Sequence, residues 1–218
     1  MDNTIRVTGK GEISVQPDMV RLILELVKVQ GSYEDALKTS ASMTEELKSC
    51  FEIFGFSRTE VKTVSFKVDT KYERYYDEAN NWKQRFAGYE FKHILKVEFP
   101  VGKELLGSML AALSQCDADP LFRLHYYVRD TASVKDALLD KAVADSKRTA
   151  GILARASGVK LGSIKTIDYS WTEMEIVAKT LERSMEMPRS SDSTDINLDI
   201  EPDLIKVTDH VTMIWNLS

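Results

Sequence analysis

The stretch Thr4-Ile-Arg-Val-Thr-Gly-Lys-Gly-Glu-Ile-Ser-Val-Gln-Pro-Asp18 decides the fold class, because it is an alternating strand pattern that ends in a turn signal. Its odd positions are apolar or glycine and its even positions are polar, which is typical of a half-buried strand. The alternation resumes on the other parity from Val20 to Leu26. The pattern therefore predicts two strands or one bent strand, and Gly9 and Gly11 suit a bulge or a close backbone approach.

Helices and a long hairpin follow. Ser32, with Asp35 three residues later, resembles a capping arrangement and begins an amphipathic helix that ends at Gly55. Residues 64–99 alternate outward and back around a turn near Asp77 to Asn81, which predicts a long β-hairpin with an aromatic tip. A short helix over residues 105–113 and a strand over residues 122–128 come next.

A third helix is predicted from about Ser133 to Ser157, and small residues are frequent in it, which lets a helix lie close to a sheet. Two strands, one near Ile164 and one from Val207 to Leu217, complete the pattern. The fold class is α+β, a mainly antiparallel sheet with a long hairpin, packed by two long helices and one short helix. The apolar stripe of the third helix is predicted to contain Val134, Ala137, Leu138, Ala142, Ile152, Leu153 and Ala156.

Two junctions in the chain resemble each other. The first helix leaves through Gly55-Phe-Ser-Arg-Thr-Glu-Val-Lys-Thr63 and the third through Gly158-Val-Lys-Leu-Gly-Ser-Ile-Lys-Thr166, each with a glycine, a short loop and a strand. Two related halves that share one sheet would fit, and so would a chance likeness of common junctions.

The composition is that of a folded domain. Of the 218 residues, 43% are hydrophobic and 29% charged, which excludes general disorder. The net charge is −5, and no run of five or more Lys or Arg occurs, so no nucleic-acid partner is predicted. No segment has the length and apolarity of a membrane span, and no export signal is seen at Met1. The expected location is cytoplasmic, or periplasmic or otherwise extracytoplasmic if a leader is missing.

One acidic stretch stands out. Between Glu173 and Asp203 nine residues are acidic and three basic, a local charge of −6. Because a strand pattern follows, we expect a mobile excursion at about residues 173–203 within a single domain of residues 1–218.

Further motifs follow the opening stretch in order: Gly88-Tyr89, Ala142-Val-Ala-Asp145, Ser157-Gly-Val-Lys-Leu-Gly162 and Ile205-Lys-Val-Thr-Asp-His-Val211. Together they resemble the SIMPL-domain family, a domain of unknown function that includes YggE-like and periplasmic immunogenic proteins of bacteria. The resemblance covers about residues 3–217. The motif residues expected to serve structural roles are Gly9, Gly11, Pro17, Asp18, Gly88, Tyr89, Asp145, Gly158 and Gly162.

The resemblance implies an α+β domain, large hollow oligomers in some members, and an association with oxidative or envelope stress. It brings no catalytic residues. Many relatives carry a signal peptide and this chain shows none, which is a departure from the family. The acidic stretch lies where the family is variable, so nothing is transferred to it.

Catalytic, cofactor and metal sites are not predicted. The three histidines have no second His or Cys at metal-ligand spacing. His93 lies on the apolar parity of its strand, so we interpret it as a hydrogen-bonded structural residue rather than a general base. Cys50 and Cys116 lie in apolar helical stretches, and Asp117 and Asp119 would raise the pKa of Cys116.

The aromatic hairpin is the most suggestive surface. Its acidic and basic side chains are mixed, which favours subunit contact over stacking on nucleic-acid bases. The residues predicted for oligomer contact are Tyr72, Tyr75, Tyr76, Trp82 and Phe86.

The leading hypothesis is a non-enzymatic, self-assembling protein with a role in stress or as a scaffold. One alternative is a ligand-binding or hydrolytic enzyme with a pocket near His93. The other is an adaptor that binds a protein partner through the acidic stretch.

Overall fold

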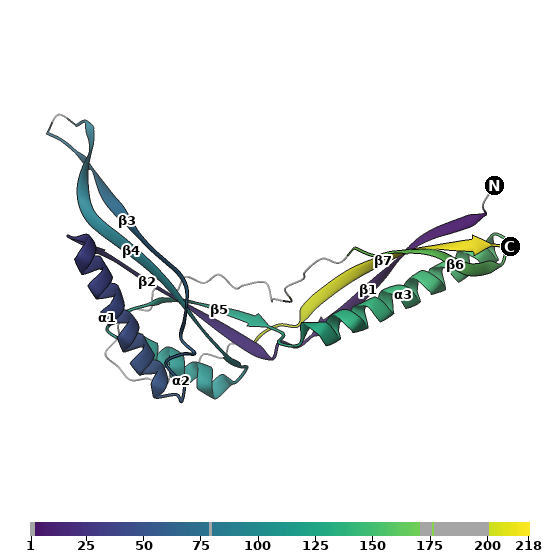
Figure 1. Ribbon diagram of the computed structural model, residues 1–218, viewed down its shortest axis with the longest axis horizontal. Helices are drawn as coiled ribbons and strands as arrows, with labels where there is room; N and C mark the ends of the chain where they lie inside the picture. The colour runs from purple at the N-terminus through teal and green to yellow at the C-terminus, as the bar shows by residue number, and fades with distance from the viewer. Residues whose placement is uncertain (1–2, 79, 171–175, 177–200) are drawn as a thin grey trace. The chain divides into compact units, whose positions relative to one another are not determined.

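The computed structural model describes residues 3–78, 80–170, 176 and 201–218, and the fold is α+β as predicted (Figure 1). The described strands are β1 (Thr4–Val15), β2 (Met19–Gln30), β3 (Lys62–Tyr76), β4 (Trp82–Pro100), β5 (Leu121–Tyr127), β6 (Leu161–Asp168) and β7 (Ile205–Leu217). The described helices are α1 (Tyr33–Glu52), α2 (Lys103–Ser114) and α3 (Thr131–Ala156). Most of the predicted acidic excursion lies outside the described residues.

The described strands form two sheets, in the orders β1-β7-β6 and β3-β4-β2-β5. The chain accordingly groups into two compact units. Of the described residues, the first unit holds 3–18, 127–170, 176 and 202–218, and the second holds 19–78, 80–126 and 201. The turn at Pro17 and Asp18 therefore separates two strands that belong to different sheets. Of the two alternatives that the sequence left open, two strands or one bent strand, the first is correct.

In the first unit α3 lies along one face of the three-stranded sheet (Figure 1). β1 and β7 pair antiparallel along their whole lengths, from Thr4 opposite Asn216 to Val15 opposite Ile205. The buried positions of both strands are all odd-numbered and face the helix, as the alternation predicts. One cluster of this core consists of Val7, Ala142, Ala150, Val211, Met213 and Trp215, and a second consists of Val128, Val134, Leu138, Ile176, Ile205 and Val207.

The buried stripe of α3 differs from the predicted one. Ala137, Ile152, Leu153 and Ala156 are exposed, and the stripe instead repeats every four residues. Small side chains form most of it because the helix lies against the glycines of β1, where larger side chains have no room. The buried residues of α3 are Val134, Leu138, Ala142, Ser146, Ala150 and Ala154.

In the second unit α1 packs on β2 and β4, and α2 packs beside α1. The Ser32 hydroxyl accepts a hydrogen bond from the backbone N–H of Asp35 at 3.1 Å, so the predicted cap is present. β2 and β4 pair antiparallel from Met19 opposite Pro100 to Gln30 opposite Tyr89. Their fully buried side chains under the helices include Val20, Leu22, Leu24, Leu26, Phe91, Leu95 and Val97.

The two units share one chain topology. In the second, α1 precedes the hairpin β3–β4, and the later hairpin strand pairs with β2. In the first, α3 precedes the pair β6–β7, and the later strand pairs with β1. Gly55 and Gly158 follow the two helices with φ of +84° and +73°. The likeness of the two junctions thus reflects a repeated arrangement, but the idea of one shared sheet is wrong, since each half has its own.

Candidate functional site

The hairpin of β3 and β4 is closed by a turn that Asp77 stabilises. The backbone N–H of Asn81 donates to Asp77 Oδ1 at 2.9 Å, and Asn80 adopts a φ of +62°, a conformation that asparagine tolerates. Lys83 Nζ lies 2.9 Å from Asp77 Oδ2. The turn lies where the sequence predicts it, and it sets Tyr76 opposite Trp82.

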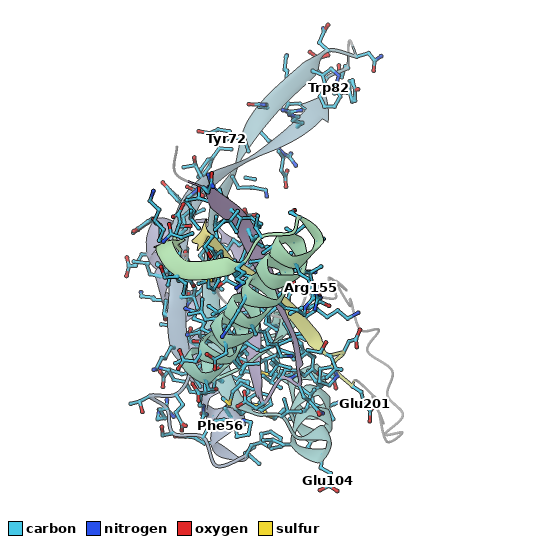
Figure 2. The ribbon with its side chains drawn as sticks, turned by 90° about the vertical axis from the view of Figure 1, so that its right-hand side faces the viewer. Phe56, Tyr72, Trp82, Glu104, Arg155 and Glu201 are labelled. Atoms are coloured by element: carbon cyan, nitrogen blue, oxygen red, sulfur yellow. The ribbon has the colours of Figure 1, made fainter. Side chains whose placement is uncertain are left out.

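The register places four aromatic residues on the same side of the hairpin, because side chains on one strand alternate between the two faces. Tyr72 pairs with Phe86 and Tyr76 with Trp82. The ring centroids of Tyr72 and Phe86 are 5.9 Å apart, and those of Tyr76 and Trp82 are 4.2 Å apart. We call these four residues the aromatic face; Figure 2 shows Tyr72 and Trp82 along the hairpin.

The aromatic face continues the side of the sheet that α1 covers. Phe86 contacts Tyr89 at 5.4 Å between centroids, and Tyr89 contacts Tyr33, the first residue of α1, at 5.9 Å. Beyond Tyr33 the hairpin runs past the end of α1 (Figure 1). There the side chains of Trp82 and Tyr72 remain 62% and 54% exposed among the described residues.

The opposite side of the hairpin is charged, and Tyr75 lies there. Its ring is 5.8 Å from the Arg85 guanidinium carbon, and Arg85 Nη2 pairs with Glu73 Oε2 at 2.9 Å. Lys71 Nζ lies 2.6 Å from Glu90 Oε1 on the same side. The structure therefore brings four of the five predicted contact residues together and places Tyr75 on the other face.

His93 is a buried residue whose two ring nitrogens meet hydroxyl groups. Nδ1 lies 3.1 Å from Ser40 Oγ and 3.2 Å from Thr44 Oγ1, and Nε2 lies 2.9 Å from Thr63 Oγ1. Burial, followed by the positive charge of Lys48, lowers the pKa of His93 below its ordinary value of 6.5. The hydrogen-bonded histidine expected from the sequence is present, and its hydroxyl partners gave no signal in the sequence.

The cysteines are half-buried thiols near a carboxylate. Cys116 Sγ donates to Glu46 Oε1 at 3.4 Å, and the backbone N–H of Ala118 donates to the same oxygen at 3.0 Å. Burial raises the pKa of Cys116 to about 11, and Glu46 adds to the rise. Burial also raises the pKa of Cys50. The nearby carboxylate is therefore that of Glu46 in α1, where the sequence had suggested Asp117 and Asp119.

Gly9, Gly11 and Asp145 fix α3 on the sheet. A β-carbon at Gly9 would lie 2.5 Å from the Ser146 backbone nitrogen, and one at Gly11 would lie well under 3.0 Å from the Leu138 carbonyl oxygen. Asp145 Oδ2 accepts the backbone N–H of Lys10 at 3.0 Å, on the edge strand of the sheet. The two glycines therefore allow α3 to lie close to β1, and Asp145 joins the helix to that strand by a hydrogen bond.

Comparison with protein families matches residues 5–215 of the chain to SIMPL, described as a protein of unknown function (DUF541). The chain belongs to the SIMPL family. Comparison with curated protein sequences gives no match.

Other residues of the sequence motifs quoted above also serve backbone geometry. Asp18 Oδ1 accepts the backbone N–H of Arg129 at 2.8 Å next to buried Pro17, which ties the end of β1 to the start of α3. Gly88 has a φ of +137°, and a β-carbon there would lie 3.1 Å from the Gln30 carbonyl carbon. A β-carbon at Gly162 would lie 2.9 Å from the Asn216 carbonyl oxygen.

The described part of the SIMPL chain contains no cluster of three or more His, Cys, Asp or Glu residues arranged to hold a metal ion. No described helix is long and apolar enough to cross a bilayer.

Proposed function

We propose that this SIMPL protein is a non-enzymatic, self-associating module and that copies meet through the aromatic face. One observation carries the proposal. The side of the sheet that α1 covers continues beyond the helix as two contacting pairs of half-exposed aromatic rings, Tyr72 with Phe86 and Tyr76 with Trp82.

The size of this surface supports the proposal. Four aromatic side chains that are about half exposed present roughly 400 Å² of ring surface, since each buries about 150–250 Å² when covered. The largest apolar patch on a monomer is about that size and is often functional. Rigid aromatic side chains are also enriched in the centres of protein interfaces.

The charges on the opposite side of the hairpin favour a protein contact over a nucleic-acid contact. Lys71, Lys83 and Arg85 each pair with a carboxylate of the same hairpin, within 2.9 Å. Binding to a phosphate backbone needs cations that are available to release counterions, and paired cations supply that weakly.

The native mass in solution tests the proposal. We compare the intact chain with the double variant Trp82→Ser, Phe86→Ser by light scattering after size exclusion at several concentrations. Both substitutions lie on β4, so they leave the outer edge of β3 unchanged. We expect the intact chain to exceed the 24.7 kDa of one chain and the variant to lose mass.

Tyr75→Ser is the matched control, because it removes an exposed aromatic ring from the other face of the same hairpin. It should keep the mass of the intact chain. A monomeric intact chain, or equal loss of mass in the control and the double variant, would contradict the proposal.

We further propose that the assembly acts in the response to oxidative stress, which the resemblance to the family supports. A strain that lacks the protein should then lose viability under peroxide and regain it with the intact chain. Rescue by the Trp82→Ser, Phe86→Ser variant would separate the stress role from the assembly.

A further inference from the structure

β3 is the edge strand of the four-stranded sheet, and its outer side has no strand beside it among the described residues. Residues 65–76 of β3 form one regular run, because the register shift at Lys71 and Tyr72 omits Ala87 of β4 and not a residue of β3. An edge of this length presents a row of backbone N–H and C=O groups that a further strand can pair with.

On the face of β3 that points away from α1, the charges alternate in sign. Lys67, Asp69, Lys71 and Glu73 follow each other at every second position, with Thr70 at their centre. Lys67 Nζ lies 2.7 Å from Asp69 Oδ2, which shows that they share one face. Reversing the order of these four charges exchanges their signs, so the strand is complementary to an antiparallel copy of itself.

We infer that β3 pairs antiparallel with β3 of a second copy of this chain, centred on Thr70 at a two-fold axis. This inference deepens the proposed function, since it names the strand through which two copies meet, and it rests on self-association. Lys67 then lies opposite Glu73 of the partner subunit, and Asp69 lies opposite Lys71 of the partner subunit. The two-fold axis repeats both pairs, which gives four attractive pairs across one edge.

The charges also select this register. A two-fold axis through an antiparallel pair keeps odd residues opposite odd residues. The axis therefore passes through a residue of β3, and the neighbouring registers place it at Asp69 or at Lys71. A centre at Asp69 would set Lys67 opposite Lys71 and Asp69 opposite its own copy. A centre at Lys71 would set Asp69 opposite Glu73 and Lys71 opposite its own copy. Directly opposed like charges are destabilising, so both neighbouring registers are disfavoured.

The neighbours of Asp69 within its own chain add to the argument. Asp69 lies opposite Glu90 of β4, a second carboxylate, and Glu90 is paired with Lys71. A lysine of the second copy beside Asp69 places a further positive charge next to this pair of carboxylates. Lysine on an edge strand usually opposes pairing with any strand, whereas this alternation opposes other strands and accepts its own copy.

The side of β3 that faces α1 fits the same register. Val68 lies opposite Tyr72 of the partner subunit, a β-branched and aromatic pair of the kind that stabilises antiparallel sheets. Phe66 lies opposite Arg74 of the partner subunit, which allows a cation–π contact. The aromatic faces of the two copies then lie on the same side of one continuous sheet.

Cysteine cross-linking tests the centre of the pairing. In Thr70→Cys the two introduced thiols lie directly opposite, about 5 Å apart between β-carbons, within reach of a disulfide after a small shift. In the control Val68→Cys the two thiols lie about 13 Å apart, since four residues separate them along the strand. With glutathione disulfide as oxidant, we expect Thr70→Cys to form a covalent dimer and Val68→Cys to stay at the level of the intact chain.

Charge exchange tests the register independently. Lys67→Glu or Glu73→Lys alone turns two attractive pairs into repulsive ones and should weaken the dimer by about tenfold or more. The double variant Lys67→Glu, Glu73→Lys loses the same contacts within the chain but restores both pairs between chains. It should regain the affinity of the intact chain to within about threefold, measured by sedimentation equilibrium.

The outcomes separate this inference from the aromatic proposal. Equal cross-linking at positions 70 and 68, or no rescue in the double charge variant, would overturn the pairing of β3. If Thr70→Cys fails to cross-link while Trp82→Ser, Phe86→Ser lowers the native mass, the proposed function stands and the strand pairing fails. Cross-linking of Thr70→Cys in a Trp82→Ser, Phe86→Ser background would show that the edge pairs without the aromatic face.

Discussion

Gly9 of β1 faces Ala142 of α3 so closely that a β-carbon at Gly9 would overlap the Ala142 carbonyl oxygen. Ala142 is itself fully buried, and Ser146, one turn later, donates its hydroxyl to the Val7 carbonyl oxygen at 3.3 Å. The first unit thus depends on a strand with no side chain where a helix backbone passes over it. Conformational freedom is not the reason for this glycine, because its backbone is that of an ordinary strand.

Gly9→Ala is expected to destabilise the first unit by about 1–3 kcal/mol, because the helix must move away from a packed core. Gly107→Ala is the control: Gly107 lies in α2 with open space around its α-carbon, so alanine should stabilise the helix by about 0.5–1 kcal/mol. Urea unfolding measures both changes, and amide hydrogen exchange locates them. Faster exchange in β1 and β7 is expected for Gly9→Ala, and unchanged exchange there would contradict the account.

Asp145→Asn should reduce the dependence of stability on acid. The backbone N–H of Lys10, and then Arg148, lower the pKa of Asp145 below its ordinary value of 3.8. The unfolded chain therefore takes up a proton at a higher pH than the folded chain, so the stabilisation is complete above about pH 5 and is lost as pH falls through the folded pKa. Urea midpoints between pH 3 and 6 should fall less steeply in the variant. Asp140→Asn, at an exposed position of the same helix, is the matched control.

The sequence predicts the elements of this fold well, because strand alternation and helix ends are local properties. The cap at Ser32 and the turn at Asp77 are examples, since each is formed by groups a few residues apart. The division of β1 and β2 between two sheets could not be predicted. Pairing partners such as Lys10 and His210 are 200 residues apart, and an apolar alternation does not specify which strand it will meet.

The sequence predicts that the tip of the hairpin is aromatic, but not which of its aromatic residues lie together on one side. Alternation along β3 alone sets Tyr75 on the other side from Tyr72 and Tyr76, but the register with β4 is needed to place Phe86 and Trp82 opposite them. The buried stripe of α3 could not be predicted from apolarity either. Ile152 and Leu153 are apolar but exposed, whereas Ser146 is buried, because the glycines of β1 require small side chains and not the most apolar ones. Hydrophobicity alone does not report that requirement.

His93 should remain neutral at pH 7, and its titration by ring NMR should have a midpoint below 6.5. Burial and Lys48 lower its folded pKa, so the unfolded chain binds the proton first and stability falls as pH drops below 6.5. His93→Gln should make this fall shallower without abolishing it, because burial also lowers the pKa of His125. His210→Gln, at an exposed site, is the control. A midpoint at or above 6.5 would show that the hydroxyl cluster around His93 stabilises the charged ring.

Cys116 should react slowly with iodoacetamide in the folded chain. Its pKa of about 11, against an ordinary value of 9.0, leaves about a hundredfold less thiolate at pH 8, and the thiolate is the reacting form. Alkylation followed by peptide mass mapping should therefore be about a hundredfold slower than in the chain unfolded by urea. Glu46→Gln removes the adjacent negative charge and should speed the reaction several-fold, whereas Glu45→Gln, which affects the pair with Arg58, should not. Equal rates in the two variants would mean that burial alone, and not Glu46, protects the thiol.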